Sequence, residues 1–211
     1  MHSLHRHGIR TRGLARRIRE ALHRARTPIA ILAVAYVCPL VIGGLLATSG
    51  NRFALDQRDA LVGAAQSSDI TAAYQQDHRM KAALLDIAGN VEAALVTSVT
   101  GLAVVGPLPI AAYRGWVGGI VSVDAQHASR LREPGPAFYY VITLVLQSIP
   151  YILTGGAGMH LGIAAWRHRS DPSVRSLLAL RIPGETIRDV GWIWALALPL
   201  FFAGSLFEFL Q

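Results

Sequence analysis

Five apolar stretches, separated by charged or polar segments, organise the chain. They cover residues 28–49, 82–106, 108–123, 136–166 and 190–210. Most of them approach or exceed the roughly 20 residues that an α-helix needs to cross about 30 Å of hydrocarbon. The pattern therefore predicts an all-α, polytopic membrane helix bundle of about five transmembrane helices, forming a single domain over residues 28–211.

The longest stretch, 136–166, contains no Asp, Glu, Lys or Arg. As one helix it would reach about 46 Å, so it must tilt, kink or fold back. Pro150 near its middle predicts the position of a break. Glycines that favour close helix packing follow it, at Gly155, Gly156, Gly158 and Gly162. Two alternatives remain: one helix kinked near Pro150, or a re-entrant segment followed by a span.

Residues 1–27 are predicted to form a basic, amphipathic cytoplasmic tail. This segment holds eight arginines, and Leu14, Ile18, Leu22 and Ala25 fall on one helical stripe. Such a helix would lie along an anionic inner leaflet. The alternative is that it docks a cytoplasmic partner. The tail histidines are interpreted as solvated rather than metal-binding; they are His2, His5 and His7.

The positions of Lys and Arg predict the orientation. With five crossings and the N-terminus inside, 14 basic residues lie inside and 6 outside, if Arg114 belongs to a short inner turn. If 136–166 crossed twice, the count would become 9 inside and 11 outside. The rule therefore favours a single net crossing. Lys81 is the only lysine, and the resulting arginine bias indicates a GC-rich bacterial genome, hence a multi-pass protein of the bacterial inner (plasma) membrane.

Composition agrees with a membrane protein and argues against a nucleic-acid partner. Hydrophobic residues make up 52% of the chain and charged residues 16%, and the excess of Lys and Arg gathers beside the first apolar stretch. Cys38 is the only cysteine, so no disulfide, CxxC redox pair or cysteine zinc site is predicted. There is no HExxH, Walker A or GxGxxG sequence, and no GxSxG with plausible partners. We predict no enzyme activity, no cofactor and no metal.

The second apolar stretch carries unusual polar content for a membrane span. Asp86 is close enough to its start to reach the interface near Lys81. Asn90 shares a helix face with Asp86, whereas Glu92 points elsewhere and lies deeper. Glu92 is a candidate for proton coupling or for an intramembrane pair with His160; otherwise it is a structural hydrogen-bonding partner for another helix.

Three further polar residues lie in the last two stretches. Gln147 is expected to hydrogen-bond backbone groups that a break at Pro150 would free. His160 is the only ionisable group of its stretch and is interpreted mainly as a packing or interfacial residue. Glu208 is expected to reach the outer interface.

Three segments together resemble the stage II sporulation protein M family of membrane proteins. They are LLDIAGNVEAALVTSVTG, AAYRGWVGGIVSVD and SIPYILTGGAGMHLG, and the resemblance covers roughly residues 82–166. Where the family has a His-Gly pair and a glutamate before its glycine run, this chain reads ITLVLQSIP, with Gln147 near the glutamate's position. The resemblance implies a multi-span protein, and the sporulation member helps to hold a peptidoglycan-remodelling complex together.

Two functions follow as hypotheses. The first is a non-enzymatic scaffold or complex subunit of the inner membrane, acting in cell-envelope or peptidoglycan remodelling. Its partners would be the lipid bilayer, other membrane or envelope proteins and, as a homo-oligomer, further copies of the chain. The alternative is a transporter or permease-like subunit that uses the broken helix and the polar residues of the second span.

Overall fold

The structure is a computed structural model that describes residues 3–174, 176–177 and 180–210, with side chains for 13–174 and 180–210. Four described helices are long and apolar enough to cross a membrane. They are α2 (Arg26–Thr48), α5 (Arg79–Thr100), α7 (Pro134–Arg167) and α8 (Gly184–Phe209). The expectation of a helical, multi-pass membrane protein is confirmed at this level.

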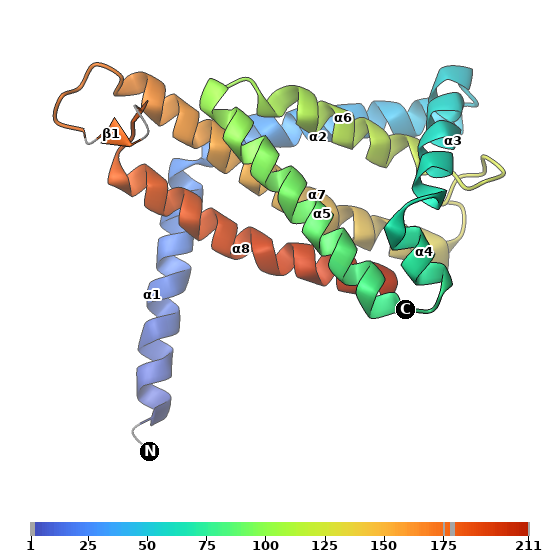
Figure 1. Cartoon of the computed structure of the whole chain (residues 1–211), viewed down its shortest axis with the longest axis horizontal. Helices are drawn as coiled ribbons and strands as arrows, with labels where there is room; N and C mark the ends of the chain where they lie inside the picture. Colours follow the sequence, from blue (N-terminus) through green and yellow to red (C-terminus); the bar gives the residue numbers. More distant parts are fainter. Residues whose placement is uncertain (1–2, 175, 178–179, 211) are drawn as a thin grey trace.

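The fifth expected span is a shorter helix, α6 (Pro107–Ile120). Its 14 residues reach about 21 Å, less than the hydrocarbon core of a bilayer. It runs back along α2 (Figure 1). The approach is close, because a Cβ added at Gly115 or Gly119 would come within 3.0 Å of an α2 backbone carbonyl. Small residues thus let this short helix pack on a longer one.

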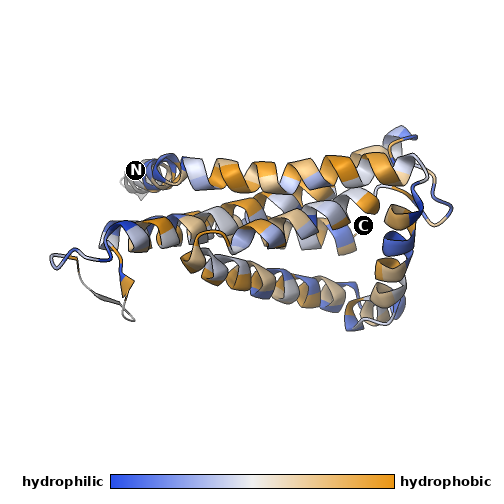
Figure 2. Cartoon of the chain, turned by 90° about the horizontal axis from the view of Figure 1, so that it is seen from above, coloured by the Kyte–Doolittle hydropathy of each residue, from blue (hydrophilic) through white to orange (hydrophobic). Residues whose placement is uncertain are grey.

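The bundle has two distinct ends. At the first, which we call the basic end, lie the α1–α2 junction, the turn over 101–106 with the short helix η1 (Gly101–Ala103), and the connection after α7. That connection contains a small hairpin of β1 (Ser176–Leu177) and β2 (Leu180–Arg181). The opposite end is covered by α3 (Arg52–Gln66), α4 (Asp69–Gln75) and the loop 121–133. Figure 2 shows polar residues concentrated at both ends and apolar residues along the long helices.

Helix α1 (Ser3–Arg24) leaves the basic end at a steep angle to the other helices, as Figures 1 and 2 both show. Ala21 and Ala25, near the junction, are fully buried, while Arg16 and Arg19 are exposed. A helix that runs crosswise to spanning helices has the orientation of a helix on a membrane surface. The side chains of His5 and His7 and the whole of His2 lie outside the described part.

Helix α7 is one continuous α-helix of 34 residues that includes Pro150. Of the two alternatives, the re-entrant segment is therefore wrong, and the single helix through Pro150 is what the structure shows. Proline removes one backbone donor, but packing against neighbouring helices holds the segment helical, as is common in membranes. Pro150 is fully buried, and its own carbonyl accepts a hydrogen bond from Thr154 Oγ1 at 2.8 Å.

The glycines after Pro150 lie at helix–helix contacts. A Cβ added at Gly158 would come within 3.0 Å of the backbone of Ser98 in α5, and one at Gly162 would meet Gly101 in the same way. Gly156 faces Ile29 of α2 at a similarly short distance, and a Cβ at Gly155 would lie 3.2 Å from the Thr97 methyl group. The glycine-rich half of α7 is therefore the part that three other segments approach most closely.

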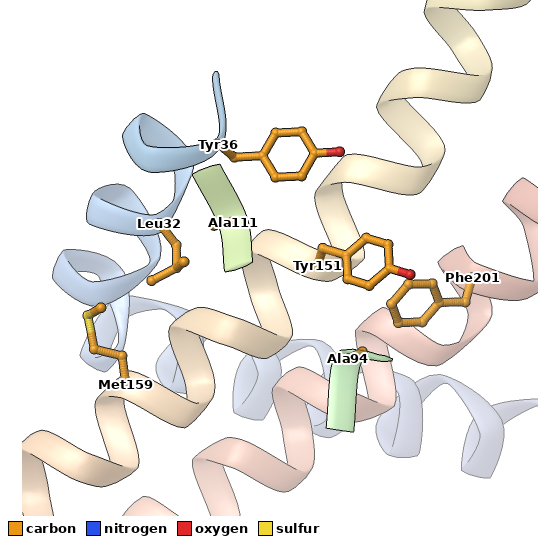
Figure 3. Packing of buried hydrophobic residues seen from close by; sticks show 7 residues of the cluster. All are labelled: Leu32, Tyr36, Ala94, Ala111, Tyr151, Met159 and Phe201. Carbon is orange, nitrogen blue, oxygen red and sulfur yellow. The ribbon is translucent and has the colours of Figure 1, made fainter. Parts of the chain in front are cut away.

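The apolar core lies where α2, α5, α6, α7 and α8 meet (Figure 3). Its buried members are Leu32, Tyr36, Ala94, Ala111, Tyr151, Met159 and Phe201. The rings of Tyr151 and Phe201 meet edge to face, with centroids 5.0 Å apart. This aromatic pair holds α7 against α8 at the depth where the polar residues described below converge.

Candidate functional site

Four hydrogen-bonded side chains, which we call the Asp86 network, join α5, α7 and α8. They are Asp86, Asn90, Tyr151 and Ser205. Asp86 Oδ2 accepts from Ser205 Oγ at 2.6 Å and from Asn90 Nδ2 at 2.8 Å. The Tyr151 hydroxyl donates to Asn90 Oδ1 at 2.6 Å. Each of these four side chains thus has a partner within the network, which removes the cost of leaving it unpaired in an apolar medium.

Asp86 was expected to reach the interface near Lys81. The structure instead turns Asp86 towards α8, while Lys81 is exposed. The reason is the helix face: Asp86 and Asn90, one turn apart, both face the bundle and reach the hydroxyl groups of other helices. Their shared face was predictable from the sequence; their partners on α7 and α8 were not.

Arg114 adds a positive charge next to the network. Its guanidinium carbon lies 3.8 Å from the centroid of the Tyr151 ring, a cation–π contact. The expectation that Arg114 marks a turn is wrong, because Pro107 begins α6 and the turn lies before it, over 101–106. Without Arg114 the inner count of basic residues becomes 13 against 6 outside, so the predicted orientation is unaffected.

Gln147 and Glu208 form a second polar contact inside the bundle. Gln147 Nε2 donates to Glu208 Oε2, and the Tyr139 hydroxyl donates to the Glu208 carbonyl oxygen at 3.0 Å. Gln147 therefore contacts α8 and not backbone groups freed by Pro150, because the helix does not break there. Glu208 is only partly exposed and points its carboxylate at α7.

His160 lies at the basic end beside a partly buried ion pair. Arg24 binds Asp189 with two hydrogen bonds, Nε to Oδ2 at 2.8 Å and Nη2 to Oδ1 at 2.6 Å, and its Nη1 lies 3.1 Å from Glu185 Oε1. Asp189 is 1% exposed. These contacts, chiefly the hydrogen bonds to Asp189, raise the pKa of Arg24 above its already high usual value. The pair fastens α1 to the start of α8.

His160 Nε2 is 3.5 Å from Asp189 Oδ2 and has no hydrogen-bond partner in the described part. The expected pair of Glu92 and His160 is therefore not formed, since the nearest carboxylate to the histidine belongs to α8. Beside the Arg24–Asp189 pair, α1 and α8 enclose a groove of about 290 Å³. Arg17 and Trp192 line it, with the guanidinium carbon 5.6 Å from the ring centroid.

Glu92 is placed unlike the other polar residues of α5. Its side chain is exposed on the outside of the bundle and makes no hydrogen bond or ion pair with any residue that the structure describes. It has neither the structural partner nor the histidine that the sequence suggested. Helix α5 therefore has two polar faces. The face with Asp86 and Asn90 points inward and its side chains are hydrogen-bonded within the chain, whereas Glu92 on the outward-pointing face has no described partner.

The opposite end has a surface contact between α3 and the loop 121–133. Asp59 accepts a hydrogen bond from Arg58 Nη1 at 2.7 Å, and its other oxygen lies 3.0 Å from His127 Nε2. These contacts, with Arg58 first, lower the pKa of Asp59 below its usual 3.8. The Trp116 indole nitrogen donates to Gln57 Oε1 at 3.2 Å, which ties α3 to α6 as well.

Sequence reasoning missed Arg24, Asp189, Tyr151 and Ser205 as parts of polar contacts. Arg24 and Asp189 are 165 positions apart, so no local pattern connects them. The sequence offered one signal for this pair. Asp189 is an acidic residue at the start of the last predicted span, and the tail predicted on the same side of the membrane is rich in arginine. Among the described residues, no group of three or more His, Cys, Asp or Glu side chains is arranged to hold a metal ion.

Comparison of the chain with family models, with curated proteins and with solved structures finds no match. The fold and the contacts above therefore carry the functional argument.

Proposed function

We propose that the chain is a multi-pass protein of the bacterial inner membrane that acts as a non-enzymatic scaffold or complex subunit. In this arrangement the N-terminus is inside and α6 is the third of five passes. The excess of basic residues at the basic end supports this orientation, and so does α1, which lies crosswise there and presents arginines to an anionic leaflet.

The observation that carries the proposal is how the intramembrane polar groups are used. Asp86, Asn90, Tyr151 and Ser205 satisfy one another, and Gln147 satisfies Glu208. Such contacts hold helices together. A catalytic or transport site would instead leave polar groups free to meet a substrate or ion.

The resemblance to the stage II sporulation protein M family supports a role in cell-envelope or peptidoglycan remodelling. Its most specific part, 148–162, coincides with the segment of α7 where glycines admit α2, α5 and η1 at close range. A rigid, closely packed bundle of this kind suits a protein that presents fixed surfaces to partners.

The transporter alternative has lost its main support. It required a helix broken near the midplane, and α7 is continuous. What remains in its favour is the position of the Arg114 guanidinium on Tyr151, next to the Asp86 network.

One experiment separates the two functions. The full chain, tagged and expressed at its native level, is purified from its own membranes in two different mild detergents. A scaffold is expected to retain the same membrane proteins in the same molar ratio in both detergents. If the chain purifies alone, and vesicles containing it alone show an ion or solute flux that Asp86→Asn abolishes while the fold stays intact, the proposal is wrong.

A further inference from the structure

Glu92 is the one charged side chain, among the described residues, that faces outward far from the ends of a spanning helix. It lies 13 residues after the first residue of α5 and 8 before the last. At 1.5 Å per residue it is about 12 Å from the nearer helix end. A glutamate side chain is too short to reach the interface from there, so in a bilayer this carboxylate would meet lipid tails, which is strongly disfavoured.

The surface around Glu92 is otherwise apolar and partly flat. Leu84, Leu95, Val96 and Val99 are exposed on the same helix. Gly89, one turn before Glu92, has nothing within 4 Å of the position that a Cβ would take. Helix backbones approach closely at such small residues. We call the exposed residues 84, 88, 89, 92, 95, 96 and 99 the outer face of α5.

We propose that the outer face of α5 binds a transmembrane helix of a different membrane protein, and that this helix carries a basic side chain which pairs with Glu92. The inference rests on the proposed scaffold function and names the surface that serves it. Charge complementarity decides the chemistry of the occupant: an uncompensated carboxylate in hydrocarbon is stabilised by an arginine, lysine or protonated histidine at the same depth.

A second copy of this chain fits the surface less well. Within α2, α5, α6, α7 and α8, two described basic side chains lie away from the helix ends, and both face other residues of the chain: the Arg114 guanidinium is stacked on Tyr151, and His160 lies 3.5 Å from Asp189. A dimer that joined two outer faces would bring two Glu92 carboxylates together. A helix from another protein satisfies the charge without that repulsion.

The test uses the full chain in its native membranes, with a photo-reactive amino acid in place of Leu95 on the outer face. A control chain carries the same group in place of Val34, which is exposed on α2. We expect a cross-linked product with one other membrane protein from position 95 only. Its yield should fall about tenfold with Glu92→Leu, as a contact of ~1.4 kcal/mol predicts, and stay unchanged with Glu92→Asp.

Three further variants complete the test. Replacing the basic residue in the partner's span by leucine should reduce the yield as Glu92→Leu does, and a charge swap, Glu92→Arg with glutamate in the partner, should restore it. Gly89→Trp should also abolish the product, because it places a bulky side chain on the outer face at a position where a Cβ meets nothing within 4 Å.

The proposal is overturned if the product contains two copies of this chain, if position 95 yields no protein product, or if Glu92→Leu leaves the yield unchanged. Failure here is distinct from failure of the scaffold function. If the complex survives purification unchanged with Glu92→Leu, the scaffold function stands and its interface lies elsewhere on the chain. If the chain purifies alone, the scaffold function and the interface on α5 are both wrong.

Discussion

Gly158→Ala tests the packing of α7 against α5, with Gly89→Ala as a matched control. Both residues are glycines within spanning helices. The alanine methyl group at position 158 would come within 3.0 Å of Ser98 backbone atoms, whereas at position 89 it would meet nothing within 4 Å. Forcing an extra methyl into such a contact costs about 1–3 kcal/mol.

The contact also includes a hydrogen bond from Ser98 Oγ to the Thr154 carbonyl oxygen, 2.7 Å long. If the helices separate enough to admit the methyl, this bond is weakened. An average intramembrane hydrogen bond contributes about 0.6 kcal/mol to stability. Together these effects predict that Gly158→Ala lowers the free energy of unfolding by about 2–3.5 kcal/mol. Gly89→Ala should leave it unchanged or raise it by up to about 1 kcal/mol, because alanine favours helix.

The measurement is a titration of the purified protein from mild detergent into SDS, followed by tryptophan fluorescence. The midpoint for Gly158→Ala should lie clearly below that of the unsubstituted chain, and the midpoint for Gly89→Ala at or above it. Equal midpoints for the two variants would refute the close approach of α5 and α7.

Three further predictions concern the ends of the bundle. Arg24→Ala should leave the buried Asp189 unpaired and lower the free energy of unfolding by about 2–3 kcal/mol. The loss is smaller than for a fully buried pair because Arg24 is partly exposed. Limited proteolysis should then cut between α1 and α2. Since the pKa of Asp59 is lower in the folded chain, its stabilising contact is present above pH 3.8 and lost as the pH falls below it; hydrogen exchange in α3 should rise there, and Asp59→Asn should remove the pH dependence. In a chain without its native cysteine, an impermeant thiol reagent added outside intact cells should label Ser67→Cys and spare Ser170→Cys; the reverse pattern would contradict the orientation.

Hydropathy placed the ends of the four membrane-length helices within six residues of those observed, because the length of an apolar stretch decides whether a helix can span a bilayer. It also predicted a span at α6, where the apolar stretch forms a helix of only 14 residues. It did not decide whether α7 continues through Pro150. A proline is compatible with either a break or a continuous helix, and the choice depends on neighbours such as Tyr151 and Thr154 that pack around it.

The polar contacts show the same limit. That Asp86 and Asn90 share a face follows from helical spacing, but their partners Tyr151 and Ser205 lie 61 and 119 positions away. The sequence marked Glu92 as unusual and offered His160 as its partner, which the structure does not place beside it. The depth of a residue can be counted along its helix from the sequence. The direction in which its side chain points depends on how the helix is rotated in the bundle, which is decided by packing between helices.

Native mass spectrometry of the complex released from its own membranes tests the central claim most directly. The account predicts that the 22.7 kDa chain is detected together with a different membrane protein. It predicts that the complex falls about tenfold relative to the free chain with Glu92→Leu, while the chain stays equally well folded. An unsubstituted chain that appears alone, or only with further copies of itself, would contradict the account.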